Sequence, residues 1–343
     1  MNYPAYFALD DVYARNHSVN ELDSMFRQEE HDFTWLNDQP NFLDNHDVSR
    51  FLTLNNSKDA LNEGLAVTST APGIPIVYYG TEQYLHNDTN GGGDPYNRLM
   101  MSGFDTTITA YTLIKRLATL RHVNLALAYG TYQPRWINDD VFVFERQFFN
   151  NVVLVAMNKS ATTDYNIGGL KTNLPAGNYN DYLHGLLTGG TGTALNVGKS
   201  GAVDPFTLGK NQVAVWRYSA PEPATPEIGS VGPQLTHAGD QLVIGGRGFT
   251  GTQGTVVIGT TKATVTNWTR HSITVIVPQI AGAQYDVKVC LDEARGACSN
   301  SYKTNTDNGT QIPVTFTVDK VRQQFLVTMY LSPATSPNWE TGA

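Results

Sequence analysis

Hydrophobic positions recur with helical spacing in the first part of the chain and with period-two spacing after about residue 127. Between residues 10 and 28 the apolar side chains follow near-helical intervals, which predicts a helix with Ser18 and Asn20 as candidate caps. The same spacing predicts helices over residues 59–70 and 109–122.

Two short apolar runs lie between these helices, one beginning at Phe42 and one spanning residues 74–79. Continuous runs of this kind are typical of parallel strands that are buried on both faces. Residues 3–9 are expected to add a short strand ahead of the first helix. Alternation of strand and helix indicates a β/α barrel, of which residues 1–127 supply about three of the eight units.

The period-two pattern begins at Trp136 and returns over residues 152–158 and 212–218. Short strands separated by Gly, Asn and Pro predict an antiparallel β-sandwich over residues 128–219. A proline-spaced linker follows at 220–226, and a second run of short strands predicts another sandwich over 227–308. Two further strands are expected in 309–343, a piece too short to bury a core by itself.

Composition is consistent with a folded, multidomain protein. The 343 residues exceed one ordinary core, and 41% are hydrophobic while 16% are charged. A net charge of −8 without a basic stripe argues against nucleic-acid binding, and no apolar run reaches the roughly 18 residues that span a bilayer. Residues 1–10 lack the basic start and cleavage site of a signal peptide, so we expect a start internal to a longer precursor rather than a cytosolic protein.

The two cysteines, Cys290 and Cys298, flank a predicted hairpin. A disulfide across two strands would suit an exported protein, whereas two free thiols are the alternative. A metal site at these cysteines is not expected, because further ligands are lacking nearby.

Residues 42–51 (FLDNHDVSRF) and 73–83 (GIPIVYYGTEQ) together resemble the last two barrel strands of the α-amylase family, glycoside hydrolase family thirteen. In detail the chain resembles maltogenic α-amylases and cyclodextrin glucanotransferases, truncated at both ends. The resemblance implies the C-terminal part of a (β/α)8 barrel, an antiparallel sandwich, an immunoglobulin-like (IPT/TIG-type) sandwich and a truncated starch-binding module, in that order.

The resemblance also assigns roles to neighbouring residues. Asp47 would stabilise the transition state and His46 would hydrogen-bond the sugar in the innermost subsite; the alternative is a strand-end histidine satisfied by an aspartate. The family's nucleophile and general acid lie upstream of this motif, where only about forty residues precede it here, so both are expected to be missing. Glu82, Asp10 and Asp11 are the other acids expected near the barrel mouth, and no motif supports them as replacements.

Three further binding positions follow from the resemblance. Asp94 and Arg98 match a loop that contacts donor-side sugars, a role that suits a carboxylate and a guanidinium fork; a surface turn with a local ion pair is the alternative. Trp136 would mark a secondary maltose site and Trp339 one wall of a starch-binding site. For both tryptophans the alternative is a place in a core or interface.

The function implied by resemblance is attack on starch and malto-oligosaccharides, by hydrolysis to maltose or by transglycosylation of the cyclodextrin glucanotransferase type. Residues 148–158 (FFNNVVLVAMN) favour the maltogenic branch. A non-catalytic α-glucan-binding fragment and a purely structural protein are the competing interpretations. An active chain would need substitute carboxylates or a second copy, and a homo-oligomer would cover the open barrel edge.

Localisation and cofactors also follow from the family. A secreted, bacterial-type protein is expected. Calcium is typical of the family, but its usual ligands fall upstream, so no cofactor and no metal site is predicted.

Overall fold

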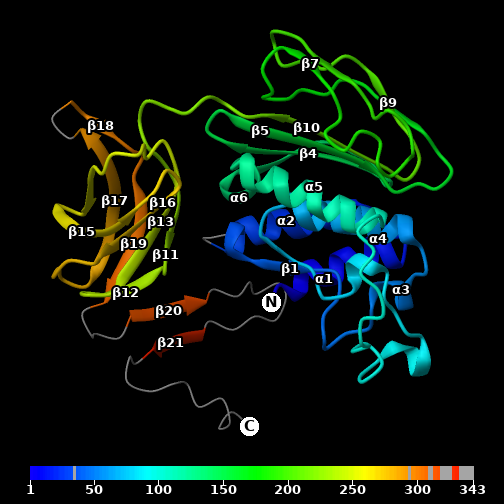
Figure 1. Ribbon diagram of the computed structural model, residues 1–343, viewed down its shortest axis with the longest axis horizontal. Helices are drawn as coiled ribbons and strands as arrows, with labels where there is room; N and C mark the ends of the chain where they lie inside the picture. Colours follow the sequence, from blue (N-terminus) through cyan, green and yellow to red (C-terminus); the bar gives the residue numbers. More distant parts are fainter. Residues whose placement is uncertain (34–35, 293–294, 308–311, 317–326, 332–343) are drawn as a thin grey trace. The chain divides into compact units, whose positions relative to one another are not determined.

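The computed structural model describes residues 1–33, 36–292, 295–307, 312–316 and 327–331, and the chain divides into two compact units, 1–220 and 221–343 (Figure 1). Each unit is described by itself below. No helix in the described ranges is long and apolar enough to cross a membrane.

The first 129 residues are mainly helical and contain two short strands. The helices are α1 (Tyr3–Leu9), the π-helix η1 (Asp10–Ala14), α2 (Asn20–Asp32), α3 (Phe51–Leu54), α4 (Lys58–Thr70), α5 (Thr109–Val123) and α6 (Ala126–Tyr129). Three 3-10 turns, η2 (Leu36–Asp38), η3 (Thr81–Gln83) and η4 (Thr89–Gly92), and the strands β1 (Pro40–Phe42) and β2 (Ile74–Ile76) complete this part. The helices predicted over 59–70 and 109–122 are confirmed as α4 and α5.

The prediction of a strand over residues 3–9 is wrong, because this segment forms α1. Pro4 stands in the first turn, where its missing N–H is not needed, and the Asn2 side chain accepts the Ala5 amide at 3.2 Å. The helix continues through η1 to Ala14, so the predicted helix over 10–28 is two helices. Asn20 opens the second, and the Ser18 hydroxyl accepts its amide at 3.2 Å.

Strands β1 and β2 pair in parallel, as the apolar runs predict, with Phe42 opposite Ile76. Phe42 is buried beneath Tyr6, whose ring stacks on it at 5.2 Å. The prediction that β2 is buried on both faces is wrong, because Ile74 and Ile76 are 45% and 37% exposed. In the described part of the chain β1 is the only sheet partner of β2, and a strand with one partner is less covered than a central strand.

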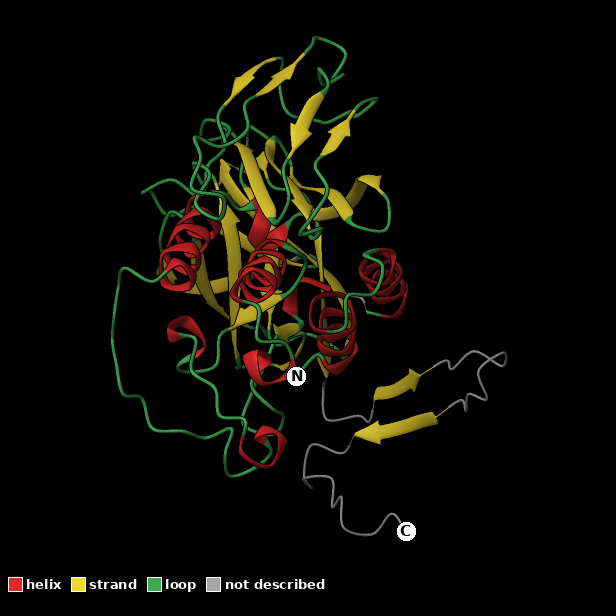
Figure 2. Cartoon of the chain, turned by 90° about the vertical axis from the view of Figure 1, so that its right-hand side faces the viewer, coloured by secondary structure: helices red, strands yellow, loops and turns green. Residues whose placement is uncertain are grey.

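Residues 131–218 form the predicted antiparallel β-structure. A four-stranded sheet has the order β10-β5-β4-β3, and two small strand pairs, β6-β9 and β7-β8, lie over one of its faces while α4, α5 and α6 lie on the other (Figures 1 and 2). The strands are β3 (Thr131–Ile137), β4 (Val141–Phe148), β5 (Asn151–Asn158), β6 (Tyr165–Ile167), β7 (Gly177–Tyr179), β8 (Leu195–Val197), β9 (Phe206–Leu208) and β10 (Gln212–Tyr218).

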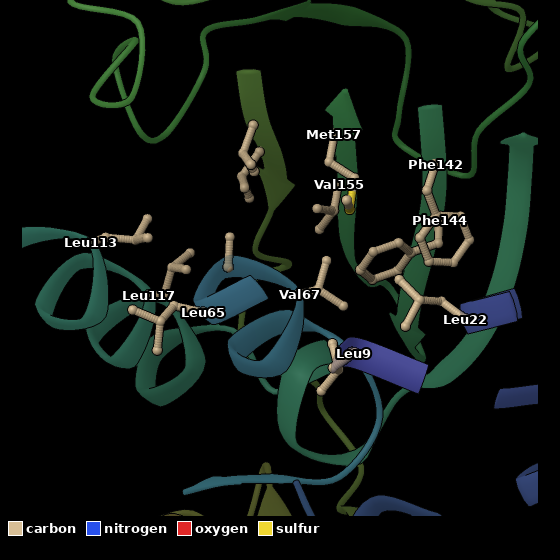
Figure 3. Packing of buried hydrophobic residues seen from close by; sticks show 14 of the residues in the cluster. Leu9, Leu22, Leu65, Val67, Leu113, Leu117, Phe142, Phe144, Val155 and Met157 are labelled. Atoms are coloured by element: carbon tan, nitrogen blue, oxygen red, sulfur yellow. The ribbon is translucent and has the colours of Figure 1, made fainter. Parts of the chain in front are cut away.

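Alternate side chains of the four-stranded sheet enter two different cores. Phe142 and Phe144 point toward the helices, where they join Leu9, Leu22 and residues of α4 and α5 (Figure 3). Val141 and Val143 point the other way, into a cluster around Trp216. Because both faces are covered, all eight residues of β5 are buried, and the sheet holds the helical part and the sandwich together as one unit.

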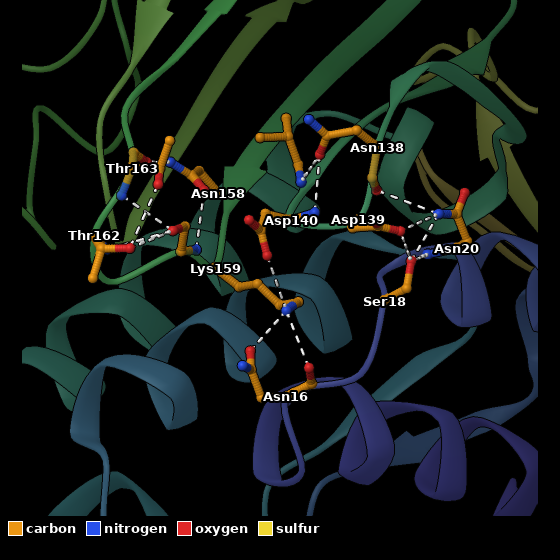
Figure 4. A network of polar contacts seen from close by, with 12 residues as sticks. Asn16, Ser18, Asn20, Asn138, Asp139, Asp140, Asn158, Lys159, Thr162 and Thr163 are labelled. Atoms are coloured by element: carbon orange, nitrogen blue, oxygen red, sulfur yellow. Dashed lines mark hydrogen bonds and ion pairs between the residues drawn. The ribbon is translucent and has the colours of Figure 1, made fainter.

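A polar network joins the loop between η1 and α2 to the sandwich (Figure 4). Lys159 is almost fully buried, and its Nζ lies 2.7 Å from Asn16 Oδ1 and 3.2 Å from Asp140 Oδ1. The Tyr165 hydroxyl donates to Asp140 at 2.6 Å, and this bond, with Lys159, lowers the pKa of Asp140. Ser18 and Asp139 share a second bond of 2.9 Å, so two segments more than 100 residues apart are fixed together.

The second unit is built of antiparallel strands around one apolar core that includes Phe249, Val275 and Val289. Its sheet order is β11-β13-β16-β15-β14-β17-β19-β12, with β18 on β17 and with β12 parallel to β19. The strands are β11 (Glu227–Gly232), β12 (Leu235–His237), β13 (Gln241–Arg247), β14 (Thr255–Ile258), β15 (Thr261–Trp268), β16 (Ser272–Ile276), β17 (Ala283–Asp292), β18 (Ala297–Cys298) and β19 (Tyr302–Asp307). Strands β20 (Ile312–Phe316) and β21 (Val327–Leu331) pair antiparallel, and Trp339 lies outside the described residues.

Cys290 on β17 and Cys298 on β18 occupy opposite positions in the sheet and are joined by a disulfide. The loop that it closes is short, with a sequence separation of 8. Replacing both residues by Ser is therefore expected to destabilise the second unit by about 2–3 kcal/mol, because the unfolded chain regains loop entropy. Urea unfolding of the oxidised, reduced and double-Ser proteins checks this value, and equal midpoints for all three would contradict it.

Glu29 on α2 is buried, and burial raises the pKa of its carboxyl to about 7, offset only in part by the Asn2 side chain. The folded state therefore keeps a proton that the unfolded state loses, so this group makes stability fall as pH rises from about 4.5 to 7. We expect Glu29→Gln to stabilise the first unit by on the order of 1–3 kcal/mol at pH 8 and by little at pH 4.5. Thermal unfolding at both pH values tests this, with Glu21→Gln on the exposed face of α2 as the control. An equal gain at both pH values would contradict the assignment.

Candidate functional site

The candidate site begins where the chain leaves β1. Asp44 and Asn45 are buried, whereas the side chains of His46 and Asp47 are 60% and 55% exposed. The Asn45 side chain accepts the Asp47 amide at 2.7 Å, which turns the backbone outward. His46 Nε2 and Asp47 Oδ1 lie 3.3 Å apart, so an imidazole and a carboxylate are presented together at the surface.

The glycine-rich loop that follows β2 reaches the same surface. Arg98 Nε lies 3.1 Å from Asp94 Oδ1 and donates to the His46 carbonyl at 3.2 Å. Asn97 is buried and donates to the carbonyls of His46 and Val48 at 2.8 and 3.0 Å. The structure therefore brings His46, Asp47, Asp94 and Arg98 together; we call these four residues the His46 site.

Arg50 lies beneath this surface and is fully buried. Its Nε donates to the Asn97 carbonyl at 2.8 Å and its Nη1 to the Tyr79 carbonyl at 2.7 Å, so one guanidinium joins the two loops. The same group lies 4.0 Å from the ring centre of Tyr78. Because burying a charged group is costly unless it is hydrogen-bonded, these bonds help to fix the position of the loops that carry the exposed residues.

Asp44 is a buried carboxylate whose pKa is influenced by the charge of Arg50. It accepts the Thr81 hydroxyl at 2.7 Å and the Phe51 amide at 3.3 Å. Burial raises the pKa of its carboxyl, and the Thr81 bond and the charge of Arg50 oppose that rise. Asp44 is therefore a buried structural carboxylate rather than one that meets a ligand.

Tyr78 forms an aromatic flank of the site. Its ring centre is 6.5 Å from that of His46, and burial is the main cause of its raised pKa. Tyr79 packs against it at 4.6 Å and donates its hydroxyl to the Leu99 carbonyl at 2.7 Å. An aromatic ring beside exposed carboxylates and a guanidinium suits a polyhydroxylated ligand, since sugar C–H faces lie on rings and hydroxyls bond to charged groups.

The other acids considered from sequence are engaged elsewhere. Asp10 and Asp11 lie 2.7 and 3.0 Å from Arg15, and burial raises the pKa of Asp10. Glu82 accepts the Gly80 amide at 2.8 Å. Among the described residues no hydrogen bond or ion pair joins any of them to His46 or Asp47.

Trp136 lies on β3, is half-buried and packs against the sandwich cluster around Trp216. No contact in the described ranges links it to the His46 site. Part of its ring therefore serves the core, which was the alternative for this residue.

One group of potential metal ligands, Asp11, His17 and Glu21, has ligand atoms within 4.8 Å of one another. His17 Nδ1 lies 3.1 Å from Glu21 Oε1, and Arg15 already pairs with Asp11. These local pairs account for the arrangement without an ion, and the group carries no metal assignment.

Sequence reasoning missed Arg50, Asn97 and Tyr78, although all three lie in the stretches that it singled out. An arginine at the end of the polar cluster that follows a buried strand was a usable signal, because it requires acceptors nearby if it is buried. Its partners are 29 and 47 residues away along the chain, and spacing alone does not identify them.

Comparison with known proteins places these features in a family. Residues 136–219 match the family model described as alpha amylase, C-terminal all-beta domain, and residues 226–318 match the IPT/TIG domain. These matches and the relatives below relate the chain to the α-amylase family.

Within that family, the chain is similar to cyclomaltodextrin glucanotransferases. It is 45% identical to the enzyme of Thermoanaerobacterium thermosulfurigenes over 323 residues. This alignment covers 93% of this chain and 44% of the relative. It is 42% identical over 343 residues to that of Bacillus licheniformis, covering 98% and 46%. The chain spans less than half the length of these relatives.

Solved structures show the same relationship. The γ-cyclodextrin glucanotransferase of alkalophilic Bacillus clarkii matches 92% of this chain and 48% of its own, at 36% identity and a TM-score of 0.79. A three-domain cyclomaltodextrin glucanotransferase, CldA, matches 64% and 44%, at 44% identity and a TM-score of 0.61. The fold class is therefore that of a multidomain amylase, with mixed α/β structure followed by all-β domains.

Proposed function

We propose that the His46 site binds α-1,4-glucans such as starch and malto-oligosaccharides, as part of a retaining glycosidase site of the amylase type. The observation that carries the proposal is the position of Arg98, which pairs with Asp94 and also bonds the His46 carbonyl. Four side chains assigned to sugar binding from two separate motifs thereby form one exposed surface.

The exposed groups suggest a division of roles. The exposed Asp47 carboxylate can accept hydrogen bonds from sugar hydroxyls. It can also stabilise the positive charge that develops on the sugar ring in the transition state. His46 donates to a hydroxyl of the same sugar unit, while Asp94 and Arg98 bind a neighbouring unit on the donor side. Arg50 and Asn97 are positioning residues, because they act through the loops that carry the other four.

Transfer and hydrolysis are both compatible with this site. The relatives named above are glucanotransferases, which supports transglycosylation as the reaction of the complete site. The maltogenic alternative drew on residues 148–158, but this stretch is largely the buried strand β5, where packing toward two cores sets the sequence. We therefore give this stretch no weight in choosing between the two.

A second candidate is α-glucan binding without turnover. Retaining chemistry uses a nucleophile and an acid/base carboxylate roughly 5 Å apart. Among the described residues the exposed carboxylates of the site are Asp47 and Asp94, and Asp94 is paired with Arg98. Turnover by this chain would then require a carboxylate from elsewhere, such as a second copy that covers the exposed surface of β2.

Soluble starch is the substrate that separates these candidates. The purified chain, Asp47→Asn and a control, Asp164→Asn on the sandwich, would be assayed for reducing ends and for cyclodextrins, with light scattering on each sample. Catalysis would be supported if the wild-type chain and Asp164→Asn release products and Asp47→Asn does not. A dimer in light scattering would support an active site that two copies share. Starch binding without release supports the second candidate, and neither binding nor release contradicts the proposal.

Secretion is proposed on separate grounds. The Cys290–Cys298 disulfide suits an oxidising compartment, and the relatives named above come from bacteria. Trp136 is proposed as a secondary sugar contact, made by the exposed part of its half-buried side chain.

A further inference from the structure

Two hollows on the first unit share one side chain, Tyr182, and use none of the residues of the His46 site. One, of about 380 Å³, is lined by α5 between Tyr111 and Thr119. The other, of about 500 Å³, is lined by residues 178–182, by His184 and by Arg217–Ser219 at the end of β10. We call the two together the Tyr182 groove.

The lining of the Tyr182 groove contains hydroxyl, amide, aromatic and basic side chains, one imidazole and the buried carboxylate of Asp181, and no aliphatic side chain. Its aromatic surface comes from four tyrosines, Tyr111, Tyr179, Tyr182 and Tyr218. Flat rings surrounded by hydrogen-bonding groups suit pyranose units, whose C–H faces lie on the rings while their hydroxyls bond to the rim.

The loop that carries Tyr182 is held rigidly. Asp181 is 2% exposed, and its carboxylate accepts the amides of Leu183, Val215 and Gly185 at 3.0, 2.9 and 2.9 Å. The Tyr182 amide donates to the Val215 carbonyl at 2.7 Å. A ring on such a loop is already in place before a ligand arrives, which reduces the entropy lost on binding.

The charges of the groove favour a neutral ligand over an anion. Lys115, Arg116 and Arg217 are the strongly basic lining residues. Arg116 donates to the Leu183 carbonyl, and the Arg217 guanidinium lies 5.3 Å from the Tyr182 ring centre and bonds the Ser219 hydroxyl at 3.1 Å. Arg116 and Arg217 are thus engaged by groups of the groove itself. Lys115 is the one lining cation for which no such contact is described, and four tyrosines line the same groove.

We propose that the Tyr182 groove is a second saccharide-binding surface, separate in its residues from the His46 site, and that its ligand is an α-glucan chain. The choice of an α-glucan rests on the proposed function, whereas the saccharide chemistry comes from the lining of the groove. Its role would be to hold a polymer while another stretch of it occupies the His46 site.

Calorimetric titration of maltoheptaose into the full chain tests the proposal. Asp47→Asn is expected to weaken one component of binding and leave another, and adding Tyr182→Ala in that background is expected to weaken the remainder at least tenfold. Tyr182→Phe keeps the ring and should keep most of the affinity, and Lys115→Ala, on an exposed position of α5, should weaken binding without disturbing the core.

The outcomes separate this proposal from the proposed function. If Asp47→Asn changes nothing while Tyr182→Ala abolishes binding, the proposed function fails and the groove stands. If Tyr182→Ala leaves the residual binding unchanged with an intact thermal transition, the groove proposal is overturned. Binding of inorganic phosphate without maltoheptaose would also overturn it, and no binding in the wild-type chain would overturn both.

Discussion

Arg50→Ala is expected to destabilise the first unit by about 3–5 kcal/mol and to weaken maltoheptaose binding at least tenfold. The substitution removes a fully buried guanidinium and leaves the carbonyls of Asn97 and Tyr79 without their donor. It also removes one of the hydrogen bonds that join the loop carrying Asp94 and Arg98 to the loop carrying His46. The binding loss should therefore be present even in mild conditions where the unit remains folded.

Arg27→Ala is the matched control for this variant, because that arginine is 58% exposed and pairs with Asp23 at the surface. It should change stability by less than about 1 kcal/mol and leave binding intact. Urea unfolding gives the first quantity and calorimetry the second. A folded Arg50→Ala protein with wild-type affinity would show that the guanidinium does not position the site.

Arg146→Met is expected to destabilise the first unit by about 3–5 kcal/mol without a direct effect on sugar binding. Arg146 is fully buried, and burial, with the nearby Arg121 charge, lowers its pKa well below the usual range. Its guanidinium donates to the carbonyls of Thr70, Thr131 and Gly130 and to the Asn37 side chain. Methionine keeps much of the side-chain volume but has no N–H donor. The four acceptor oxygens therefore stay buried without hydrogen bonds, which costs free energy.

The second unit provides an internal control for this experiment. Residues 221–343 form a separate compact unit with its own core, so its unfolding transition should not move. Two transitions in urea, of which Arg146→Met shifts only the one assigned to residues 1–220, are the expected result. A Met variant within 1 kcal/mol of the wild type would mean that the four acceptors find other donors.

The elements that could be predicted from sequence were those in which the spacing of apolar residues alone indicates the type of secondary structure. Helices α4 and α5 and the strands of the four-stranded sheet follow directly from spacing. The two apolar runs were placed only in part, because β1 ends at Phe42, where the first run begins, and β2 covers 74–76 of the second. Residues 3–9 were predicted as a strand, whereas Asn2 and Pro4 provide a helix start. Burial of β2 was overestimated, because burial depends on neighbouring strands and a run of apolar residues does not record them.

The exposed residues of the candidate site could also be named from sequence, but only through resemblance to a family. The network beneath them could not be predicted from sequence. Arg50 donates to carbonyls that are 29 and 47 residues away along the chain, and only the fold brings them together. The Tyr182 groove was missed for a similar reason. Its tyrosines come from a helix, a loop and a strand, and no periodic pattern connects them.

The most direct test of the central claim, that His46, Asp47, Asp94 and Arg98 form one α-glucan site, is a calorimetric titration of maltoheptaose into three variants. Asp47→Asn and Asp94→Asn change the two motifs separately, and Asp164→Asn changes an exposed carboxylate on the sandwich. The account predicts that the first two each weaken the same binding component by tenfold or more, while Asp164→Asn leaves it unchanged. Wild-type affinity in either Asp47→Asn or Asp94→Asn would contradict the claim that these residues share one site.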